Sequence, residues 1–519
     1  GRRSFAFVAR WVGKEQARRV GALSLDGVGV LHEPRRVYPN RTLAAQVLGF
    51  ANIDGRGVRG IEQIEDAWLR GTARRIPVER DARGRLLSAG GEERWSTAGG
   101  DIALTIDSAL QADAEAALAE TVLRTGARGG VVISLDPRSG EILALAEAPG
   151  FDPNRFREID YRSTRSRAFL DASDPGSTMK AFLLAGALEH GAVTPDQEFD
   201  CEGGSYQVPG RVIHDSRPHG VLTVAEVLQV SSNICAAKIA FALGRRPHFD
   251  ALRRFGFGEV TGIGFPGESA GVLRPWSEWR PLDHATIAFG QGVSVTPIQM
   301  AAATAALANG GQWLRPRLVK ARRAARGPWR PARTNTPHRA TSPAAAALVV
   351  AMMERVVSAE GTARRAALSG VRVAGKTGTA QKFDPETGTY ADDRFAAWFI
   401  GIVPADDPKL VIVTGVDEPA RPLHTGGAAA APLFARVASA QLARFGILAE
   451  PVFDAPAAPG LPATRLAAAV KNAAPATPAV SSSPLGAAPV AARPFAEPAE
   501  ATAPPVQLMR FGDRMLLPD

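Results

Sequence analysis

The stretch of sequence that decides the fold is Asp174-Pro175-Gly176-Ser177-Thr178-Met179-Lys180-Ala181-Phe182-Leu183-Leu184. A serine three residues before a lysine shares one face of a helix with it, because positions i and i+3 are neighbours there. We expect Asp174 to cap this helix, Pro175 to suit its first turn and Gly191 to end it. Most of the other side chains are apolar, so the helix is expected to be buried.

Burial lowers the pKa of a lysine amine, and a neutral amine beside a serine hydroxyl can activate that hydroxyl as a nucleophile. Ser177 and Lys180 are therefore candidates for nucleophile and base. The pattern Ser-x-x-Lys is short, however, and a capping serine followed by an unrelated surface lysine is the better explanation when the motif stands alone.

Two further motifs follow in order, Ser231-Ser232-Asn233 and Lys376-Thr377-Gly378. The first lies at a turn between two helical segments. Ser231 can relay a proton to a leaving nitrogen, and Asn233 can hold both the lysine and a substrate amide. Ser232, between them, is predicted to contact the substrate. Plain turn residues would also fit this motif, but three such motifs in one chain favour catalysis.

The Lys376-Thr377-Gly378 motif lies on a predicted strand. Lys376 supplies a positive charge that helps to keep Lys180 neutral and attracts an anionic substrate. The hydroxyls of Thr377 and Thr379 can bind a terminal carboxylate, and Gly378 leaves room for a substrate along the strand edge. The backbone N–H groups of Ser177 and Thr379 are expected to form the oxyanion hole. Alternatively, Lys376, Thr377 and Gly378 are ordinary residues of an edge strand with no catalytic role.

The amino-acid composition limits the classes of protein to which the chain can belong. A chain of 519 residues with 45% hydrophobic and 22% charged residues has room for two or three domains with a large core. The net charge of +9 is spread along the chain and only 4 Tyr are present, which argues against a nucleic-acid partner. No metal-ligand spacing occurs, no cofactor is expected, and Cys201 and Cys235 are predicted to be free thiols.

The order of segments predicts an α+β architecture, an antiparallel sheet flanked by helices behind a small mixed N-terminal module. Residues 1–100 are predicted to form a non-catalytic pedestal, 101–447 the catalytic domain and 448–508 an Ala/Pro-rich disordered linker. Segment 315–339 holds nine Arg or Lys and no acidic residue, and is predicted to be a solvated basic loop; a surface facing anionic lipid or wall polymer is the alternative. The predicted helices span 107–124, 223–230, 234–244, 284–309, 342–358 and 426–445, and the predicted strands span 131–136, 141–145, 372–380, 395–403 and 410–416.

The three motifs in this order are typical of active-site serine β-lactamases and penicillin-binding proteins. Beyond them, the chain resembles a class B penicillin-binding protein, a monofunctional peptidoglycan D,D-transpeptidase, over residues 30–445. Its N-terminal segments resemble the cell-division branch of that family. The resemblance rests on segments 35–39, 44–50, 57–62, 289–297 and 375–381.

This resemblance implies the serine β-lactamase/penicillin-binding transpeptidase fold, D-Ala-D-Ala stem peptides of peptidoglycan as donors, and β-lactam antibiotics as acylating inhibitors. It also implies a periplasmic location, an N-terminal membrane anchor outside this sequence, and the division-machinery glycan polymerase as partner. The end of the chain, 509–519, resembles the opening of a PASTA repeat. Two other functions stay open: a D,D-carboxypeptidase or β-lactamase with water as acceptor, and a non-enzymatic penicillin sensor or division scaffold.

Overall fold

A five-stranded antiparallel sheet forms the centre of the molecule. Its strands, in spatial order, are β14 (Ala374–Asp384), β15 (Thr389–Val403), β16 (Leu410–Asp417), β4 (Gly129–Leu135) and β5 (Ile142–Ala148). All five strands predicted from the sequence lie in this sheet, and the predicted antiparallel arrangement is confirmed. β4 is buried along its whole length, as expected for an apolar strand between two neighbours, whereas β14 pairs only with β15 and forms one edge. The computed structural model describes residues 6–30, 33–71, 78–80, 86–89, 98–325, 327–334, 336–384, 387–453, 509–511 and 514–516.

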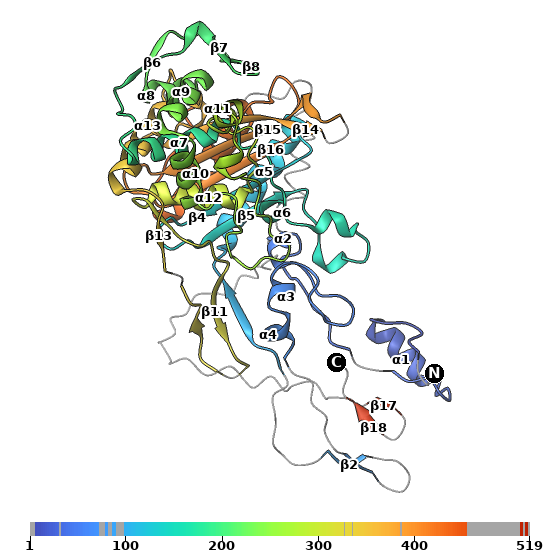
Figure 1. Cartoon of the computed structure of the whole chain (residues 1–519). Helices are drawn as coiled ribbons and strands as arrows, with labels where there is room; N and C mark the ends of the chain where they lie inside the picture. The colour runs from blue at the N-terminus through green and yellow to red at the C-terminus, as the bar shows by residue number, and fades with distance from the viewer. Residues whose placement is uncertain are drawn as a thin grey trace, which may run out of the picture.

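Two groups of helices cover the sheet (Figure 1). In the first group, α5 contacts β4, β5 and α14, and α14 contacts β15 and β16; in the second, α12 contacts the central strands and α13 contacts α12 and α7. Asp107 caps α5 through the N–H groups of Ala109 and Leu110, because a carboxylate there satisfies orphan donors. These helices are α5 (Ser108–Thr125), α7 (Met179–Glu189), α12 (Pro297–Ala308), α13 (Pro343–Val357) and α14 (Ala431–Leu442).

The helix predictions are confirmed with two differences. Segment 284–309 forms two helices, α11 (Pro281–Ile287) and α12, because a glycine-containing loop separates them and Thr296 starts a new capping box. The last predicted helix begins as a π-helical turn, Gly426–Ala430, before continuing as α14.

A narrower part of the molecule extends away from the sheet (Figure 1). It combines N-terminal helices with a three-stranded sheet to which the distant segment 315–339 contributes two strands. The prediction of a solvated loop there is therefore wrong, since backbone pairing with β3 and ion pairs to acidic partners order much of it. The elements are α2 (Ala45–Leu48), α3 (Gly60–Ile64), α4 (Asp66–Arg70), β3 (Asp101–Leu104), β11 (Val319–Arg323) and β12 (Arg330–Pro331).

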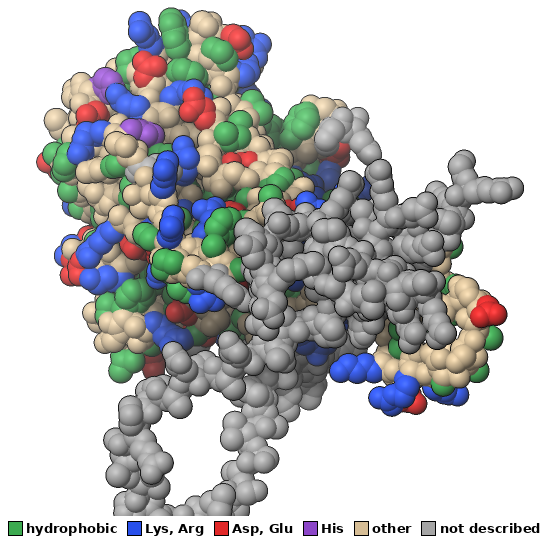
Figure 2. Space-filling view, turned by 90° about the horizontal axis from the view of Figure 1, so that it is seen from below, with side chains coloured by type: hydrophobic (Ala, Val, Ile, Leu, Met, Phe, Trp, Pro, Cys, Tyr) green, Lys and Arg blue, Asp and Glu red, His purple; other side chains and the backbone are tan. Residues whose placement is uncertain are grey.

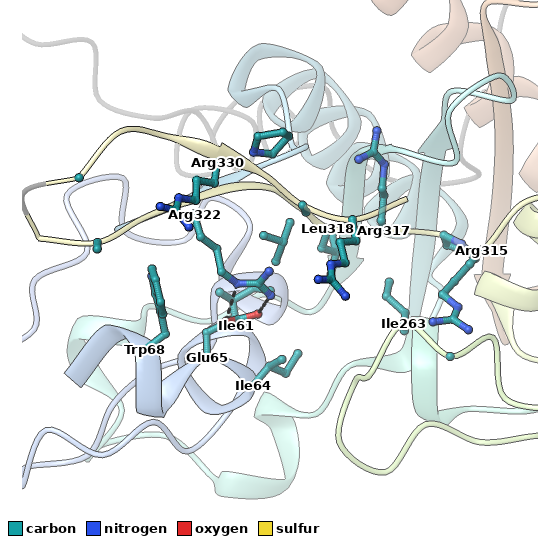
Figure 3. A pocket seen from close by; sticks show the side chains of 18 of the residues that line it. Ile61, Ile64, Glu65, Trp68, Ile263, Arg315, Arg317, Leu318, Arg322 and Arg330 are labelled. Atoms are coloured by element: carbon teal, nitrogen blue, oxygen red, sulfur yellow. Dashed lines mark hydrogen bonds and ion pairs between the residues drawn. The ribbon is translucent and has the colours of Figure 1, made fainter. Parts of the chain in front are cut away.

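A cavity of about 690 Å³ lies between helices α3 and α4 and strands β11 and β12 (Figure 3). Arg322 spans it to form a two-pronged ion pair with Glu65, with Arg322 Nε 3.0 Å from Glu65 Oε2. Arg317 pairs with Glu141 at 2.7 Å, and Arg323 pairs with Asp101. The basic residues of this segment thus join the narrow part to the N-terminal helices and to the main body.

The N-terminal residues also pack directly on the main body. Tyr38, Ala45 and Phe50 form a small apolar cluster with Phe151. Tyr38 N–H donates to Asn154 Oδ1 at 2.9 Å, and Asn154 Nδ2 donates to Tyr38 O at 2.8 Å. On the face shown in Figure 2, Lys and Arg side chains of the described residues are interspersed with Asp and Glu.

Cys201 and Cys235 form a disulfide, so the prediction of two free thiols is wrong. The chain leaves the main body at β6 (Glu198–Asp200), returns at β9 (Val221–Thr223) and pairs the two strands, which brings Cys201 against helix α9 (Asn233–Leu243) with a Cα–Cα distance of 5.2 Å. We call residues 198–223 the excursion. It also contains the hairpin β7 (Ser205–Val208) and β8 (Arg211–His214).

At the C-terminal end, residues 449–452 lie against the main body: Ser369 N–H donates to Glu450 O at 2.8 Å, and Val452 N–H donates to Ala367 O at 3.0 Å. The rest of the predicted linker, 454–508, lies outside the described residues. Of segment 509–519, strands β17 (Met509–Phe511) and β18 (Arg514–Leu516) are described, and they pair antiparallel. Among the described helices, none has the length and hydropathy of a membrane span.

Candidate active site

Ser177 lies in a tight turn of 3-10 helix, Gly176–Thr178, that leads directly into α7. The expected side-chain cap by Asp174 is absent. Instead, Asp174 accepts a hydrogen bond from Tyr390 Oη on β15 at 2.7 Å and lies 3.4 Å from the N–H of Gly292. The α-helix begins two residues after Ser177 and ends before the left-handed Gly191, as predicted.

Lys180 is 1% exposed, and its amine lies at the centre of the site. Lys180 Nζ is 3.0 Å from Ser177 Oγ, 2.8 Å from Asn233 Oδ1 and 2.7 Å from Ser231 O. Burial, followed by the nearby charge of Lys376, holds the pKa of Lys180 well below its ordinary value of 10.5. A neutral amine at this distance can accept the proton of Ser177.

Ser231 Oγ lies between the two lysines, 3.2 Å from Lys180 Nζ and 3.0 Å from Lys376 Nζ. Burial lowers the pKa of Lys376 to about 7. A bound carboxylate would favour the charged form. The arrangement offers a continuous hydrogen-bonded path from Ser177 through Lys180 and Ser231 to Lys376.

The Ser231–Asn233 motif forms the turn between α8 (Val224–Val230) and α9. Ser231 has a left-handed backbone with φ of +67°, an unfavourable conformation for a residue with a side chain. Ser232 points away from Ser177: it is buried, and its hydroxyl caps α9 by accepting from the N–H of Cys235 at 3.1 Å. The structure therefore gives no support to the predicted contact between Ser232 and substrate.

Strand β14 brings the third motif beside the serine turn. Gly378 allows this approach, because a Cβ at that position would lie 2.6 Å from Pro175 O. Gly176 has a φ of +56°, and a Cβ there would lie 3.2 Å from Thr379 N, so the backbone segments of Ser177 and Thr379 are neighbours. This placement fits the predicted oxyanion hole, and β14 is the open sheet edge that the predicted substrate would extend.

The two threonine hydroxyls of this strand have defined partners. Thr377 Oγ1 lies 2.9 Å from Thr362 Oγ1 and 3.4 Å from Lys376 Nζ. Thr379 is exposed, and its Oγ1 accepts from the N–H of Gly426 at 3.0 Å, which leaves its own proton available to a ligand.

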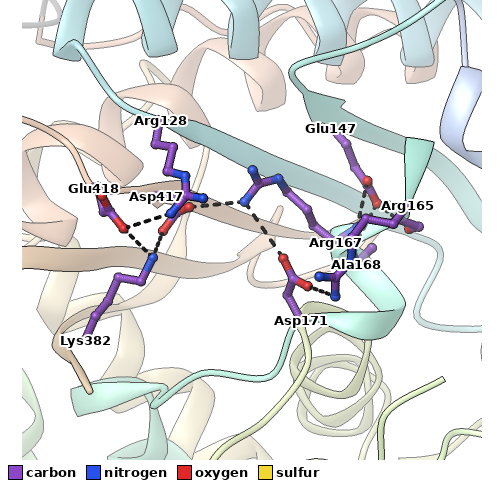
Figure 4. Close-up of polar contacts among 10 residues, drawn as sticks. Arg128, Glu147, Arg165, Arg167, Ala168, Asp171, Lys382, Asp417 and Glu418 are labelled. Atoms are coloured by element: carbon purple, nitrogen blue, oxygen red, sulfur yellow. Dashed lines mark hydrogen bonds and ion pairs between the residues drawn. The ribbon is translucent and has the colours of Figure 1, made fainter. Parts of the chain in front are cut away.

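A polar network ties the end of β14 to the elements before Ser177 (Figure 4). Lys382 on β14 pairs with Asp417 on β16 at 2.8 Å, and Asp417 also pairs with Arg167 at 3.1 Å. Arg167 begins the short helix α6 (Arg167–Leu170), whose N–H groups at Arg167 and Ala168 bind the buried Glu147. The network fixes the strand and the helix that flank the serine turn.

Sequence reasoning missed two acidic residues of the site, Asp174 as a partner of Tyr390 and Asp215 as a partner of the Ser231–Asn233 turn. Neither lies at a motif spacing from its partner. Both contacts join segments that are distant in the sequence.

Comparison with known proteins identifies the family to which this chain is similar. The family model "Penicillin binding protein transpeptidase domain" matches residues 130–439. The chain is 34% identical over 453 residues to "Probable peptidoglycan D,D-transpeptidase PbpC" of Pseudomonas aeruginosa, covering 87% of this chain and 78% of the relative. It is 32% identical over 436 residues to "Peptidoglycan D,D-transpeptidase FtsI" of Escherichia coli, covering 83% and 71%.

Among solved structures, penicillin-binding protein 3 of Mycobacterium tuberculosis matches with a TM-score of 0.71 and 33% identity, covering 81% of this chain and 93% of that one. Structures of the same protein complexed with aztreonam and with ampicillin match equally well by TM-score. Together with the observed sheet, these matches confirm the predicted fold. The chain belongs to the class B penicillin-binding protein transpeptidases.

Proposed function

We propose that this protein is a serine-type peptidoglycan D,D-transpeptidase that cross-links D-Ala-D-Ala stem peptides during septal wall synthesis. The observation that carries the proposal is the buried amine of Lys180, 3.0 Å from Ser177 Oγ and held by Asn233 and Ser231. A lysine without its charge in this position has the geometry and basicity to activate the serine. The names of the relatives supply the substrate class.

In the proposed acylation step, Lys180 Nζ takes the proton of Ser177 while Ser177 Oγ attacks the carbonyl carbon of the penultimate D-Ala. The N–H groups of Ser177 and Thr379 stabilise the oxyanion. When the C–N bond breaks, Ser231 passes its proton to the leaving nitrogen and regains one from Lys180, which becomes neutral again, and terminal D-Ala departs. An ester between Ser177 and the stem peptide remains.

In the second step, an amine of a neighbouring stem peptide attacks the ester carbonyl and loses a proton to the Lys180–Ser231 pair. The new amide bond is the cross-link, and Ser177 Oγ recovers its proton. Lys376, Thr377 and Thr379 hold the terminal carboxylate of the donor, and Gly378 lies on the strand edge along which the donor extends. We expect β-lactams to acylate Ser177 by the same first step; the Mycobacterium tuberculosis relative has been solved in complex with two of them, aztreonam and ampicillin.

Among the described residues, two carboxylates that lie in or contact the motif segments already have protein partners. Asp174 is engaged by Tyr390, and Asp215 caps α9, so both carboxylates already serve protein groups. Rapid deacylation by water needs a free base placed to activate it. The carboxypeptidase and β-lactamase alternative therefore has less support.

The cellular context is also a proposal. We assign residues 1–100 to a pedestal and 101–447 to the transpeptidase domain, and we infer a periplasmic location, an N-terminal membrane anchor in the full-length protein, and the division glycan polymerase as partner. Two of the N-terminal segments that support the septal assignment contain α2 and α3; α2 contacts α3 and β5, and α3 lines the cavity together with strands β11 and β12. A fluorescent fusion of the full-length protein should concentrate at the division site, and uniform labelling of the envelope would contradict the septal role.

The catalytic proposal is tested with a fluorescent penicillin. The purified protein should form one stable adduct that peptide mass spectrometry locates on Ser177, and Ser177→Ala should form none. Folded protein that forms no adduct would contradict the proposal, and rapid loss of the adduct would favour the hydrolase. A cross-linking assay with lipid-linked stem peptides then separates a transpeptidase from a sensor.

A further inference from the structure

Asp215, in the excursion just after β8, binds the Ser231–Asn233 turn that also holds Lys180. Its Oδ2 accepts from Ser232 Oγ at 2.6 Å, and its Oδ1 accepts from the N–H groups of Asn233 and Ile234, the latter at 3.1 Å. These N–H groups belong to the first turn of α9, where a carboxylate is stabilised by orphan donors and by the helix dipole. One side chain thus contacts three consecutive residues at the start of this helix.

The same turn carries the groups that hold Lys180. Asn233 Oδ1 and Ser231 O each lie within 2.8 Å of Lys180 Nζ, and the left-handed backbone of Ser231 needs surrounding contacts to persist. The residue before Asp215 adds a further constraint, because His214 O accepts from Asn233 Nδ2 at 3.2 Å. The orientation of the Asn233 amide towards Lys180 therefore depends on the excursion.

The excursion itself is fastened to α9. The Cys201–Cys235 disulfide joins its first part to the helix, and Lys238 donates to Asp200 O at 2.6 Å and pairs with Glu202 at 2.7 Å. Backbone bonds link Cys201 to Gly220 and Asp215 to Gly204, so the two ends of the excursion move together. Asp215 is therefore presented to the turn by a closed, covalently anchored loop.

We propose that Asp215 is a positioning residue for acylation, which fixes the Ser231–Asn233 turn against Lys180 and contributes a negative charge on that side of the site. The inference rests on the proposed function, because it concerns the same lysine and serine. The charged groups that act on Lys180 are then Lys376 on β14, which opposes its charge, and Asp215 in the excursion, which favours it.

The test compares Asp215→Asn with Asp215→Glu and with Asp196→Asn, a charge-matched control at an exposed position before the excursion. The second-order rate constant for acylation by a fluorescent penicillin is measured from pH 5 to pH 10, per mole of titrated active site, together with the melting temperature. Asparagine at 215 has one acceptor oxygen for three donors, so we expect a loss of roughly tenfold or more in acylation rate. Asp215→Glu should recover part of the rate, and Asp196→Asn should match the wild type.

The pH profile separates positioning from a purely structural role. Removing the carboxylate lowers the pKa of Lys180 further, so the acid limb of the Asp215→Asn profile should move to lower pH. Wild-type rates in Asp215→Asn, or slower rates with an unmoved acid limb in that variant, would overturn this inference alone. A wild-type protein that is never acylated at Ser177 would overturn the proposed function and this inference together.

Discussion

Gly378→Ala tests how closely strand β14 must approach the nucleophile. A Cβ at residue 378 would lie 2.6 Å from Pro175 O, 3.0 Å from Thr178 Cγ2 and 3.2 Å from Trp398 Cβ. Ordinary contact begins at 3.4 Å, so the strand and the serine turn must separate by about 0.8 Å to relieve the first contact. Pro175 O is a backbone atom, and it cannot move aside without moving the turn.

A displacement of this size acts directly on the reacting groups, because the turn carries Ser177 and the strand carries Thr379. Misplacement by about 1 Å costs on the order of 100-fold in rate, so we expect a loss of this order in acylation by a fluorescent penicillin. Overpacking should also cost about 1–3 kcal/mol of stability, which thermal unfolding will show as a lower melting temperature.

Gly150→Ala is the matched control, since a Cβ there meets nothing within 4 Å. It should leave both the acylation rate and the melting temperature unchanged. If Gly378→Ala were acylated as fast as Gly150→Ala, the close approach of β14 to the serine turn would not matter for reactivity, and the reasoning would be refuted.

Three further predictions concern stability. Replacing Cys201 and Cys235 by serine opens a loop with a sequence separation of 34, and the chain-entropy model predicts that the free energy of unfolding falls by about 4 kcal/mol. Urea unfolding with and without reductant measures this loss. An unchanged unfolding midpoint would contradict the prediction. Burial lowers the pKa of His248 from 6.5 to about 3. As the pH falls below 6.5, the unfolded state therefore binds a proton at His248 before the folded state does. At pH 4.5 this difference lowers the free energy of unfolding by about 3 kcal/mol. His248→Gln should lose correspondingly less stability than the wild type between pH 7 and pH 4.5, and equal losses would count against this. Arg322→Met leaves the largely buried carboxylate of Glu65 unpaired and should cost about 1–2 kcal/mol of stability. Limited proteolysis should then cleave the narrow part more easily, while the acylation rate stays unchanged. Unaltered cleavage would argue against a stabilising role for the ion pair.

The sequence predicted those parts of the fold whose signals are local. The strands predicted at 131–136 and 141–145 pair as β4 and β5, and the helix predicted at 223–230 begins with a capping box of Thr223 and Glu226. The three motifs were recognisable because each is short and continuous. The structure brings Lys180, Ser231 and Lys376 into one hydrogen-bonded group although they are far apart in sequence.

The features that the sequence did not reveal depend on contacts between distant segments. Pairing of β6 with β9 is needed before Cys201 can meet Cys235, and neither cysteine has a spacing that indicates it. The basic segment 315–339 pairs with β3 and completes the narrow part, which its charge alone could not indicate. Ser232 lies between two residues that face Lys180, yet the helix start turns its hydroxyl inward to Asp215.

The central claim is that Lys180 is the neutral base that activates Ser177, and the pH dependence of wild-type acylation tests it most directly. Because burial and Lys376 hold the pKa of Lys180 well below 10.5, the rate constant for acylation by a fluorescent penicillin should stop rising at a pH well below 10.5. A rate that continues to rise up to the ordinary lysine pKa of 10.5 would show that Lys180 is charged at neutral pH, and would contradict this mechanism.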